Sequence, residues 1–175
     1  TRMLEARRYM EMCLKVKREI ESTGIPVKVV STGETWSYDV APYMPEITEV
    51  EGGTYALMGT NCSYLEEFRI AAKVLSTVIS VPRKNVAVGD VGVRAMGGPG
   101  GVLPTLVGHN EIAIKRILEG TIFMESRGPM PFVVGDQFLL HSAQQDVMVN
   151  RWDQFIAVRN EVVVAVWEIS ARGCH

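Results

Sequence analysis

Cysteine is scarce in this sequence, and its spacing gives neither a disulfide framework nor a metal motif. The three cysteines, Cys13, Cys62 and Cys174, lie far apart with no CxxC pair. Small secreted domains need many paired cysteines, and Cys-based zinc sites need closely spaced ones. The sparse, odd count excludes both classes and predicts a reducing compartment, which we take to be the cytoplasm.

The sequence also lacks a basic excess and long apolar runs. It has 18 Lys and Arg against 20 Asp and Glu, a formal net charge of -2, and no Lys/Arg cluster. A nucleic-acid or anionic-membrane partner would call for a basic patch, so we expect neither. The longest apolar runs are too short to span a bilayer, and no charged start followed by an apolar run marks a signal peptide.

What is present is typical of a globular protein. Of the 175 residues, 47% are hydrophobic and 22% are charged. That length is enough for one domain with a substantial core, or for one small domain plus part of another.

The first third of the sequence predicts α/β structure. Residues 1–22 fit an amphipathic helix whose apolar stripe is Tyr9, Cys13, Val16 and Ile20, with Gly24 ending it in a left-handed conformation. Residues 25–31 (IPVKVVS) predict a short buried strand. The Pro-rich residues 39–46 predict a loop, and residues 47–58 predict a second strand-like run interrupted by Gly52 and Gly53.

From about residue 68 the hydrophobic period changes to two, and turn signals separate several short strand-like runs. Residues 109–119 fit either a short helix or another strand. The fold class we predict is α/β followed by all-β, with residues 1–62 as the C-terminal portion of a TIM-like (β/α) barrel and residues 63–175 as a β-barrel-like domain. One helix and two parallel strands cannot close a barrel, so we expect a partner chain or an N-terminal segment to complete it.

The stretch STGETWSY at residues 31–38 carries more hydroxyl groups than a turn needs. Ser31, Thr32 and Thr35 surround Gly33 directly after a predicted strand. Backbone N–H groups and short hydroxyl side chains around a glycine are suited to hold a small anion. A solvated loop is the alternative for this stretch taken alone.

Seven short stretches, taken in order, resemble one enzyme family. They are VSTGETWSY, TEVEGGTYALM, AAKVLSTVIS, VAVGDVGVRAM, GDQFLLHSAQQD, VN and VWEISARG. Their order and spacing are similar to those of the D-threonine aldolase and D-serine dehydratase-like family, pyridoxal-phosphate enzymes of the alanine-racemase fold type. The resemblance extends over about residues 1–173 and corresponds to the C-terminal half of a full-length member.

This resemblance implies a cofactor site. Ser31, Gly33 and Thr35 resemble the family's phosphate-binding turn, and Gly53, Thr54 and Tyr55 resemble its second cofactor-binding segment at the next barrel strand. A phosphate dianion needs several N–H and O–H donors, and glycine lets the backbone approach it closely. Active sites of such barrels lie at the C-terminal ends of the strands.

The family's metal-binding pair is altered here. Alignment on Val149 and Asn150 puts Gln144 and Asp146 where members have His-x-Cys or His-x-Asp. On a strand these two side chains would share one face. A carboxylate and an amide oxygen favour Mg²⁺ or Mn²⁺ over Zn²⁺, so any divalent metal is expected to bind weakly. His141 could substitute only with a backbone shift.

Other departures affect proton transfer and the Schiff base. Arg127 replaces the family's usual histidine and Gly59 its aspartate, while Asp90 is retained and is expected to order a β turn. The family's Schiff-base lysine lies N-terminal to everything in this chain, and Lys28 does not match it.

The resemblance therefore implies part of a lyase acting on D-3-hydroxy amino acids, by retro-aldol cleavage or by dehydration and deamination. Such a protein needs an N-terminal half that carries the lysine, binds a D-amino-acid-like small molecule, and forms a homodimer or higher oligomer. A catalytically inactive relative and an amino-acid racemase of the same fold are the alternatives.

Overall fold

The computed structural model describes residues 1–98 and 102–173, so Cys174 lies outside the described residues. The chain divides into two compact units, Thr1–Ala56 and Leu57–His175. Each is described by itself. Among the described residues, no helix combines the length and apolar character that crossing a membrane would need.

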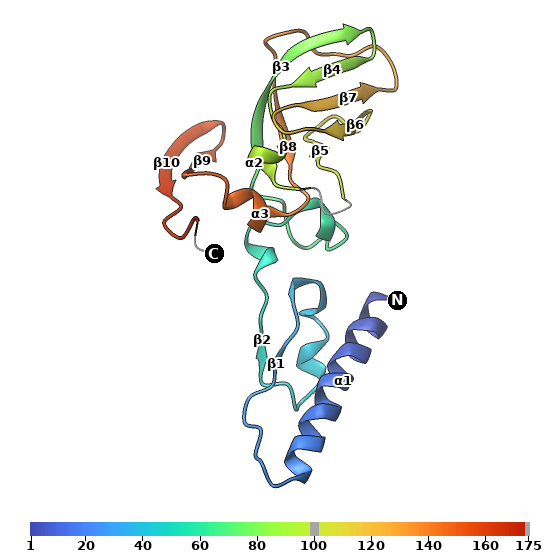
Figure 1. The fold of residues 1–175 in the computed structure, drawn as a ribbon, viewed down its shortest axis with the longest axis vertical. Helices are drawn as coiled ribbons and strands as arrows, with labels where there is room; N and C mark the ends of the chain where they lie inside the picture. Colours follow the sequence, from blue (N-terminus) through green and yellow to red (C-terminus); the bar gives the residue numbers. More distant parts are fainter. Residues whose placement is uncertain (99–101, 174–175) are drawn as a thin grey trace. The chain divides into compact units, whose positions relative to one another are not determined.

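The first unit is built on one long helix, α1 (Arg2–Ser22), drawn in blue in Figure 1. The predicted helix is confirmed, and Gly24 follows it with φ +88°, as a left-handed terminating residue should. The predicted buried stripe is wrong. Ala6, Met10 and Leu14 are the buried side chains of α1.

The stripe predicted to be buried lies on the solvent side of α1. Tyr9, Val16 and Ile20 are exposed apolar side chains, and Cys13 is exposed as well. The helix thus has two adjacent apolar faces. The face with Ala6 packs against a small cluster formed by Val30, Val40, Ala41 and Met44.

Two short parallel strands follow α1. They are β1 (Ser31–Thr32) and β2 (Glu49–Val50), with Ser31 opposite Glu49. The predicted strand over 25–31 was too long, because residues 25–30 have no ladder partner in the described chain and only Val30 among them is buried. Short 3₁₀ turns complete the unit: η1 (Thr35–Ser37), η2 (Ala41–Tyr43) and η3 (Thr54–Ala56).

The second unit is dominated by β structure, as its period-two pattern predicts. A turn, η4 (Thr60–Cys62), precedes a six-stranded sheet with the order β5-β8-β3-β4-β7-β6, and all neighbouring strands are antiparallel. Its strands are β3 (Val74–Arg83), β4 (Val86–Gly89), β5 (Thr105–Leu106), β6 (Ile112–Ile117), β7 (Ile122–Ser126) and β8 (Gln137–His141).

The sheet curls until its two end strands, β5 and β6, contact each other, and it is nearly closed (Figure 1). Val78, Ala87, Ile122, Met124 and Leu140, each less than 2% exposed, lie in its core. Residues 109–119, which fitted a helix or a strand, form β6. One of the strand-like runs, NVAVGDVGVRAM at residues 85–96, is a strand only as far as Gly89, and a single helical turn, α2 (Val93–Met96), follows it.

The last elements lie outside this sheet. They are a short helix, α3 (Gln145–Val149), and a hairpin of β9 (Gln154–Arg159) and β10 (Val162–Glu168), which forms a sheet of its own.

Candidate functional site

The first glycine turn begins where β1 ends. Gly33 has φ +85°, which side chains other than glycine adopt rarely, and a Cβ here would lie 3.3 Å from Met10 Cε. The turn then closes on itself, because the Glu34 N–H donates to Ser37 Oγ at 3.0 Å. Gly33 is therefore required by backbone shape, whatever the turn binds.

The second turn follows β2 and includes Gly52, Gly53 and Thr54. Gly53 has no positive φ, and a Cβ built on it would enter open space. Neither backbone strain nor packing in the unit therefore demands glycine at position 53. A ligand that approaches the backbone closely is a physical reason for a glycine there.

A hydrogen bond joins the two turns. The Tyr55 N–H donates to Thr35 Oγ1 at 3.0 Å, and Thr35 is only 2% exposed. A Cβ on Gly52 would lie 3.7 Å from the same hydroxyl oxygen. The parallel pairing of β1 with β2 brings the ends of both strands to one edge, and the Thr35 hydroxyl holds the two turns together there.

Two carboxylates lie in the same turns, and the sequence analysis gave them no role. The Ser31 hydroxyl donates to the Glu51 carboxylate, and Glu34 follows Gly33 directly. Both acidic residues are exposed, so solvent screens their charges. The Ser31 hydroxyl is thus already bonded to a carboxylate, with which any anion at this turn would compete.

The predicted metal pair does not fit a metal site. Gln144 and Asp146 were expected to alternate on a strand, but Gln144 is the N-cap of α3 and Asp146 lies in its first turn. Residues two apart on a helix point to different sides, and Asp146 is exposed. Within residues 1–98 and 102–173, no group of three or more His, Cys, Asp and Glu side chains is arranged to hold a metal ion.

His141 does not take the place of the missing ligand. It ends β8 and is half-buried, and burial together with the nearby Lys73 lowers the pKa of its imidazole. The ring is therefore neutral at physiological pH. β8 ends at His141, three residues before Gln144, so taking the place of that ligand would still require the backbone shift expected from the sequence.

The turn at Gly59 packs tightly on the start of α3. A Cβ at Gly59 would lie 2.6 Å from the Ala143 carbonyl oxygen and 3.0 Å from Gln145 Oε1. The Thr60 N–H donates to the Ser142 carbonyl at 2.9 Å. Gln145 Oε1 is buried and has no hydrogen-bond partner in the described part of the chain. The glycine that replaces the family's aspartate is therefore a packing requirement in this chain.

Asp90 has the structural role that was expected for it. Its carboxylate accepts hydrogen bonds from the Ser76 hydroxyl at 2.9 Å and from the Thr77 N–H at 2.8 Å. It thus fastens the end of β4 to β3. Arg127 lies exposed just after β7.

Comparison with known proteins identifies the family. The family described as "Putative serine dehydratase domain" matches residues 71–158, half of this chain. The chain belongs to this family. The match confirms the resemblance seen in the sequence.

As a member of the serine dehydratase domain family, the chain is similar to two curated aldolases. It is 28% identical to the 3-hydroxy-D-aspartate aldolase of Paracoccus denitrificans (strain Pd 1222) over 165 residues, which is 88% of this chain and 42% of that protein. It is 27% identical to the D-threonine aldolase of an Arthrobacter species over 161 residues, 88% of this chain and 42% of that protein. The chain thus spans about two fifths of the length of these relatives, which fits a C-terminal half.

A solved structure shares the fold. The crystal structure of D-threonine aldolase from Filomicrobium marinum superposes with a TM-score of 0.87 at 21% identity, covering 98% of this chain and 48% of that one.

Proposed function

We propose that this chain is part of a pyridoxal-phosphate-dependent lyase acting on D-3-hydroxy amino acids. The reaction would be retro-aldol cleavage or dehydration with deamination. Membership of the serine dehydratase domain family and the aldolase names of the curated relatives support this class of reaction.

The main structural support for the proposal is that the two glycine turns lie in contact. The Tyr55 N–H···Thr35 Oγ1 hydrogen bond joins them, and Gly53 leaves open space beside the second turn. In the proposal, the Ser31 hydroxyl and the backbone N–H groups near Gly33 and Gly53 hold the cofactor phosphate. A phosphate dianion suits this set of uncharged donors.

In the proposal, Ser31, Thr35 and the two glycine turns bind and orient the cofactor. When bound, pyridoxal phosphate supplies an electron sink for the bond that breaks at the substrate's Cα or Cβ. Thr35, held in place by burial, fixes the spacing of the two turns. The position of the phosphate then sets the position of the ring, because the two are joined by one short covalent arm.

The lysine that binds the cofactor aldehyde would come from outside this chain. Lys28 is exposed and lies before β1 rather than in either turn. We propose that an N-terminal half, as a preceding segment or a second chain, supplies this lysine and completes the barrel to which residues 1–62 belong. In this proposal the chain alone is inactive, and the complete protein works as a homodimer or higher oligomer in the cytoplasm.

Metal assistance has no place in this proposal, because Gln144 and Asp146 do not form a site that fits a divalent ion. The same observation favours a second candidate function, that of a catalytically inactive relative. Such a protein would keep the phosphate turns and bind the cofactor without turning over substrate.

Binding of pyridoxine 5′-phosphate, measured by isothermal titration calorimetry, tests the phosphate site directly. This ligand lacks the aldehyde, so surface lysines do not capture it. We expect it to bind at least tenfold more tightly than pyridoxine, and inorganic phosphate to compete with it. Equal affinities for pyridoxine and its phosphate would contradict the proposal.

A pair of glycine variants locates the binding. Gly53→Val places a side chain in the open space beside the second turn, whereas Gly128→Val, the matched control, also enters open space but lies in the other unit. We expect at least a tenfold loss of affinity for Gly53→Val and none for Gly128→Val.

With the lysine-bearing half present, the reaction products distinguish the candidate activities. Release of an aldehyde indicates the aldolase, and release of a 2-oxo acid and ammonia indicates the dehydratase. Release of neither product indicates the inactive relative.

A further inference from the structure

Three oxygen atoms crowd against one glycine where η4 packs on the start of α3. A Cβ built on Gly59 would lie 2.6 Å from the Ala143 carbonyl oxygen and 2.9 Å from Asn61 Oδ1. It would lie 3.0 Å from Gln145 Oε1. Because the three oxygens lie so close to one point, they border the same small space, which any side chain at position 59 would fill.

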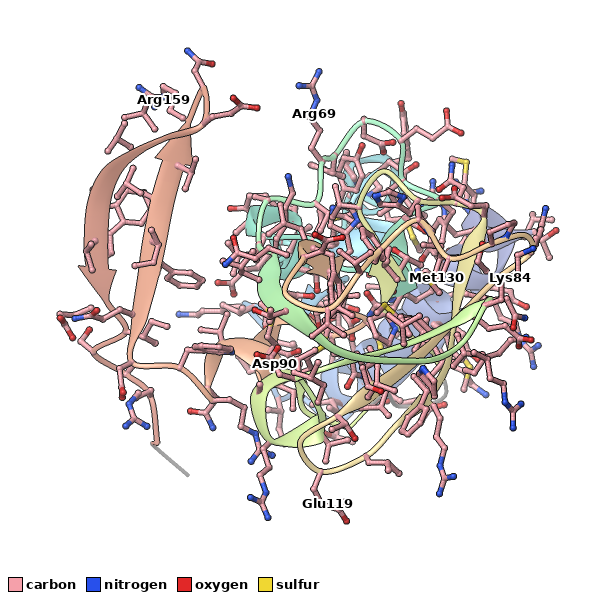
Figure 2. The ribbon with its side chains drawn as sticks, turned by 90° about the horizontal axis from the view of Figure 1, so that it is seen from above. Arg69, Lys84, Asp90, Glu119, Met130 and Arg159 are labelled. Atoms are coloured by element: carbon pink, nitrogen blue, oxygen red, sulfur yellow. The ribbon has the colours of Figure 1, made fainter. Side chains whose placement is uncertain are left out.

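One of these oxygens has no partner inside the protein. Gln145 is 8% exposed, and its Oε1 atom accepts no hydrogen bond from any residue that the structure describes. Buried polar atoms are nearly always paired, with water or an ion where the chain supplies no donor. The basic side chain nearest to Asn61 in the sequence, Arg69, is exposed and points outward into solvent (Figure 2). It therefore brings no positive charge to the three oxygens.

The chemistry of the three oxygens indicates the kind of ligand. One backbone carbonyl and two side-chain amides supply them, so all three accept hydrogen bonds and none carries a formal charge. Mg²⁺ and Ca²⁺ sites in proteins generally include carboxylates, and Mg²⁺ demands short contacts of about 2.0–2.1 Å. Groups of neutral carbonyl oxygens instead bind potassium, whose hydration shell they replace. A water molecule has two hydrogens to donate and satisfies only two of three acceptors.

We propose that the oxygens of Asn61, Ala143 and Gln145 bind a monovalent cation of the size of potassium or ammonium. Water molecules complete its coordination on the side of Asn61, which is exposed. The ligands include no carboxylate and no imidazole, so this site is separate from the pair of side chains at positions 144 and 146.

The role of the ion is structural. It fastens η4 to the start of α3, at the place where the Thr60 N–H donates to the Ser142 carbonyl at 2.9 Å. Glycine at position 59 lets the ion approach the backbone closely. All of these residues belong to the second unit, so the site does not depend on the proposed activity.

A rotated amide is the competing explanation for the unpaired oxygen. A turn of the Asn61 amide by 180° exchanges its oxygen and its nitrogen. Asn61 Nδ2 would then donate to Gln145 Oε1, and no ion would be needed. The two explanations differ in one measurable respect, because only the bound ion makes the stability of the second unit depend on the cation in solution.

Urea denaturation of the 175-residue chain in potassium chloride tests the proposal, with choline chloride holding the ionic strength constant. An ion that binds only the folded state stabilises it by mass action. An increase in potassium from about 2 to about 200 mM should therefore raise the folding equilibrium constant of the second unit at least threefold. Ammonium should act as potassium does. Lithium is smaller and more strongly hydrated, and it should have little effect.

Two variants with matched controls assign the effect to these oxygens. Gln145→Leu removes one ligand and should abolish the potassium dependence, whereas Gln137→Leu changes an exposed glutamine of the same unit and should retain it. Asn61→Asp supplies a charged oxygen and should lower the potassium concentration at half-effect at least fivefold. Asn110→Asp adds the same charge at an exposed turn and should leave that concentration unchanged.

A crystal of the chain grown with thallium(I) locates the ion, because thallium(I) takes the place of potassium and scatters anomalously. We expect an anomalous peak beside the oxygens of Asn61, Ala143 and Gln145. Three results would overturn the proposal. They are equal stability in potassium and in choline at 200 mM, a stabilisation that lithium matches or that Gln145→Leu retains, and a crystal in which the Asn61 amide nitrogen contacts Gln145 Oε1 without an ion.

Discussion

The two units cover their apolar side chains to different degrees. In Leu57–His175 the six-stranded sheet curls on itself, and its core contains side chains with no exposed surface, such as Met124 and Leu140. In Thr1–Ala56 one face of α1 packs on a small cluster, while the adjacent apolar face and Val29 lie exposed. A nearly closed sheet encloses its own core, whereas two paired strands and one helix cannot.

This difference indicates where each unit draws its stability. The second unit has the buried area that drives folding by itself. The first unit depends on one small buried cluster and leaves an apolar face of α1 exposed. The following predictions test this difference, beginning with the largest expected effect.

The largest effect is expected at Gly92, where two backbone segments of the second unit lie very close together. A Cβ at Gly92 would lie 2.3 Å from the Leu118 carbonyl oxygen, so Gly92→Ala forces the backbone apart. We expect a loss of roughly 3–4 kcal/mol in the free energy of unfolding of this unit, measured by urea denaturation. Gly120→Ala is the control, because its Cβ would meet nothing within 4 Å. Similar losses for both variants would show that the tight contact does not exist.

Truncation of one buried methionine in each unit compares the two cores. Met124 is completely buried in the sheet and Met10 is 2% exposed under α1. Met124→Ala should cost about 2–4 kcal/mol, and Met10→Ala about half as much, because the small cluster can collapse into the space. Hydrogen exchange followed by mass spectrometry assigns each loss to its unit. Equal losses of stability for the two variants, or a single unfolding transition for both units, would contradict the difference between the two cores.

The ion pair that fastens α1 to the rest of the first unit predicts a pH dependence. Arg2 Nη1 and Nη2 donate to the two carboxylate oxygens of Asp39 at 2.8 and 2.6 Å, and this hydrogen bonding lowers the pKa of Asp39 from its ordinary 3.8. A lowered carboxyl pKa stabilises the fold above the pKa of the unfolded chain. That contribution is lost as the pH falls below 3.8 and through the folded pKa.

Asp39→Asn should therefore destabilise the first unit at pH 7 by about 0.5–1 kcal/mol, a modest value because solvent screens this half-exposed pair. The same substitution should have little effect near pH 2. Urea denaturation at both pH values measures the difference. Glu49→Gln changes an exposed carboxylate that forms no ion pair in the described residues and serves as the control. A cost that does not change with pH would exclude the ion pair as its origin.

The smallest expected effect concerns Glu51, which lies between the two glycine turns in the sequence of the first unit. Glu51 accepts the Ser31 hydroxyl that we assign to the phosphate, so Glu51→Gln removes a competing negative charge. We expect about a two- to fivefold gain in affinity for pyridoxine 5′-phosphate, less at high salt because the group is exposed. Glu49→Gln, two residues earlier in β2, should give little change. A loss of affinity in Glu51→Gln would show that the carboxylate supports the site instead.

The sequence predicted most of the second unit because half-buried antiparallel strands leave a period-two pattern. The long strand Val74–Arg83 and the strand Ile122–Ser126 follow that pattern closely. Gln144 and Asp146 were placed on a strand because a five-residue helix is too short to show a helical period. The face of α1 was misassigned since two adjacent apolar faces give the same periodicity, and only tertiary contacts reveal which one packs.

The positions of the two glycine turns were predictable from the sequence, but the hydrogen bonds within them were not. The pattern of glycine and hydroxyl residues located the turn at Gly33, and the family resemblance located the turn at Gly53. The structure joins the two turns through Thr35. The role of Glu51 had no signal beyond its position before Gly52, because a hydrogen bond to Ser31 depends on strand pairing. The assignment of residues 1–62 to a barrel and of the turns to a phosphate stays a prediction.

The order of strands in the sheet also bears on how the second unit folds. Pairs such as β3 with β4 and β6 with β7 join neighbours in the sequence, whereas β3 with β8 joins Val74 to Leu140. Closing so long a loop costs more chain entropy than forming a hairpin, and the contact comes late in a nascent chain. During synthesis the edge of β3 that pairs with β8 therefore stays unpaired until β8 has left the ribosome. During that interval the unpaired apolar edge makes the unit prone to aggregate.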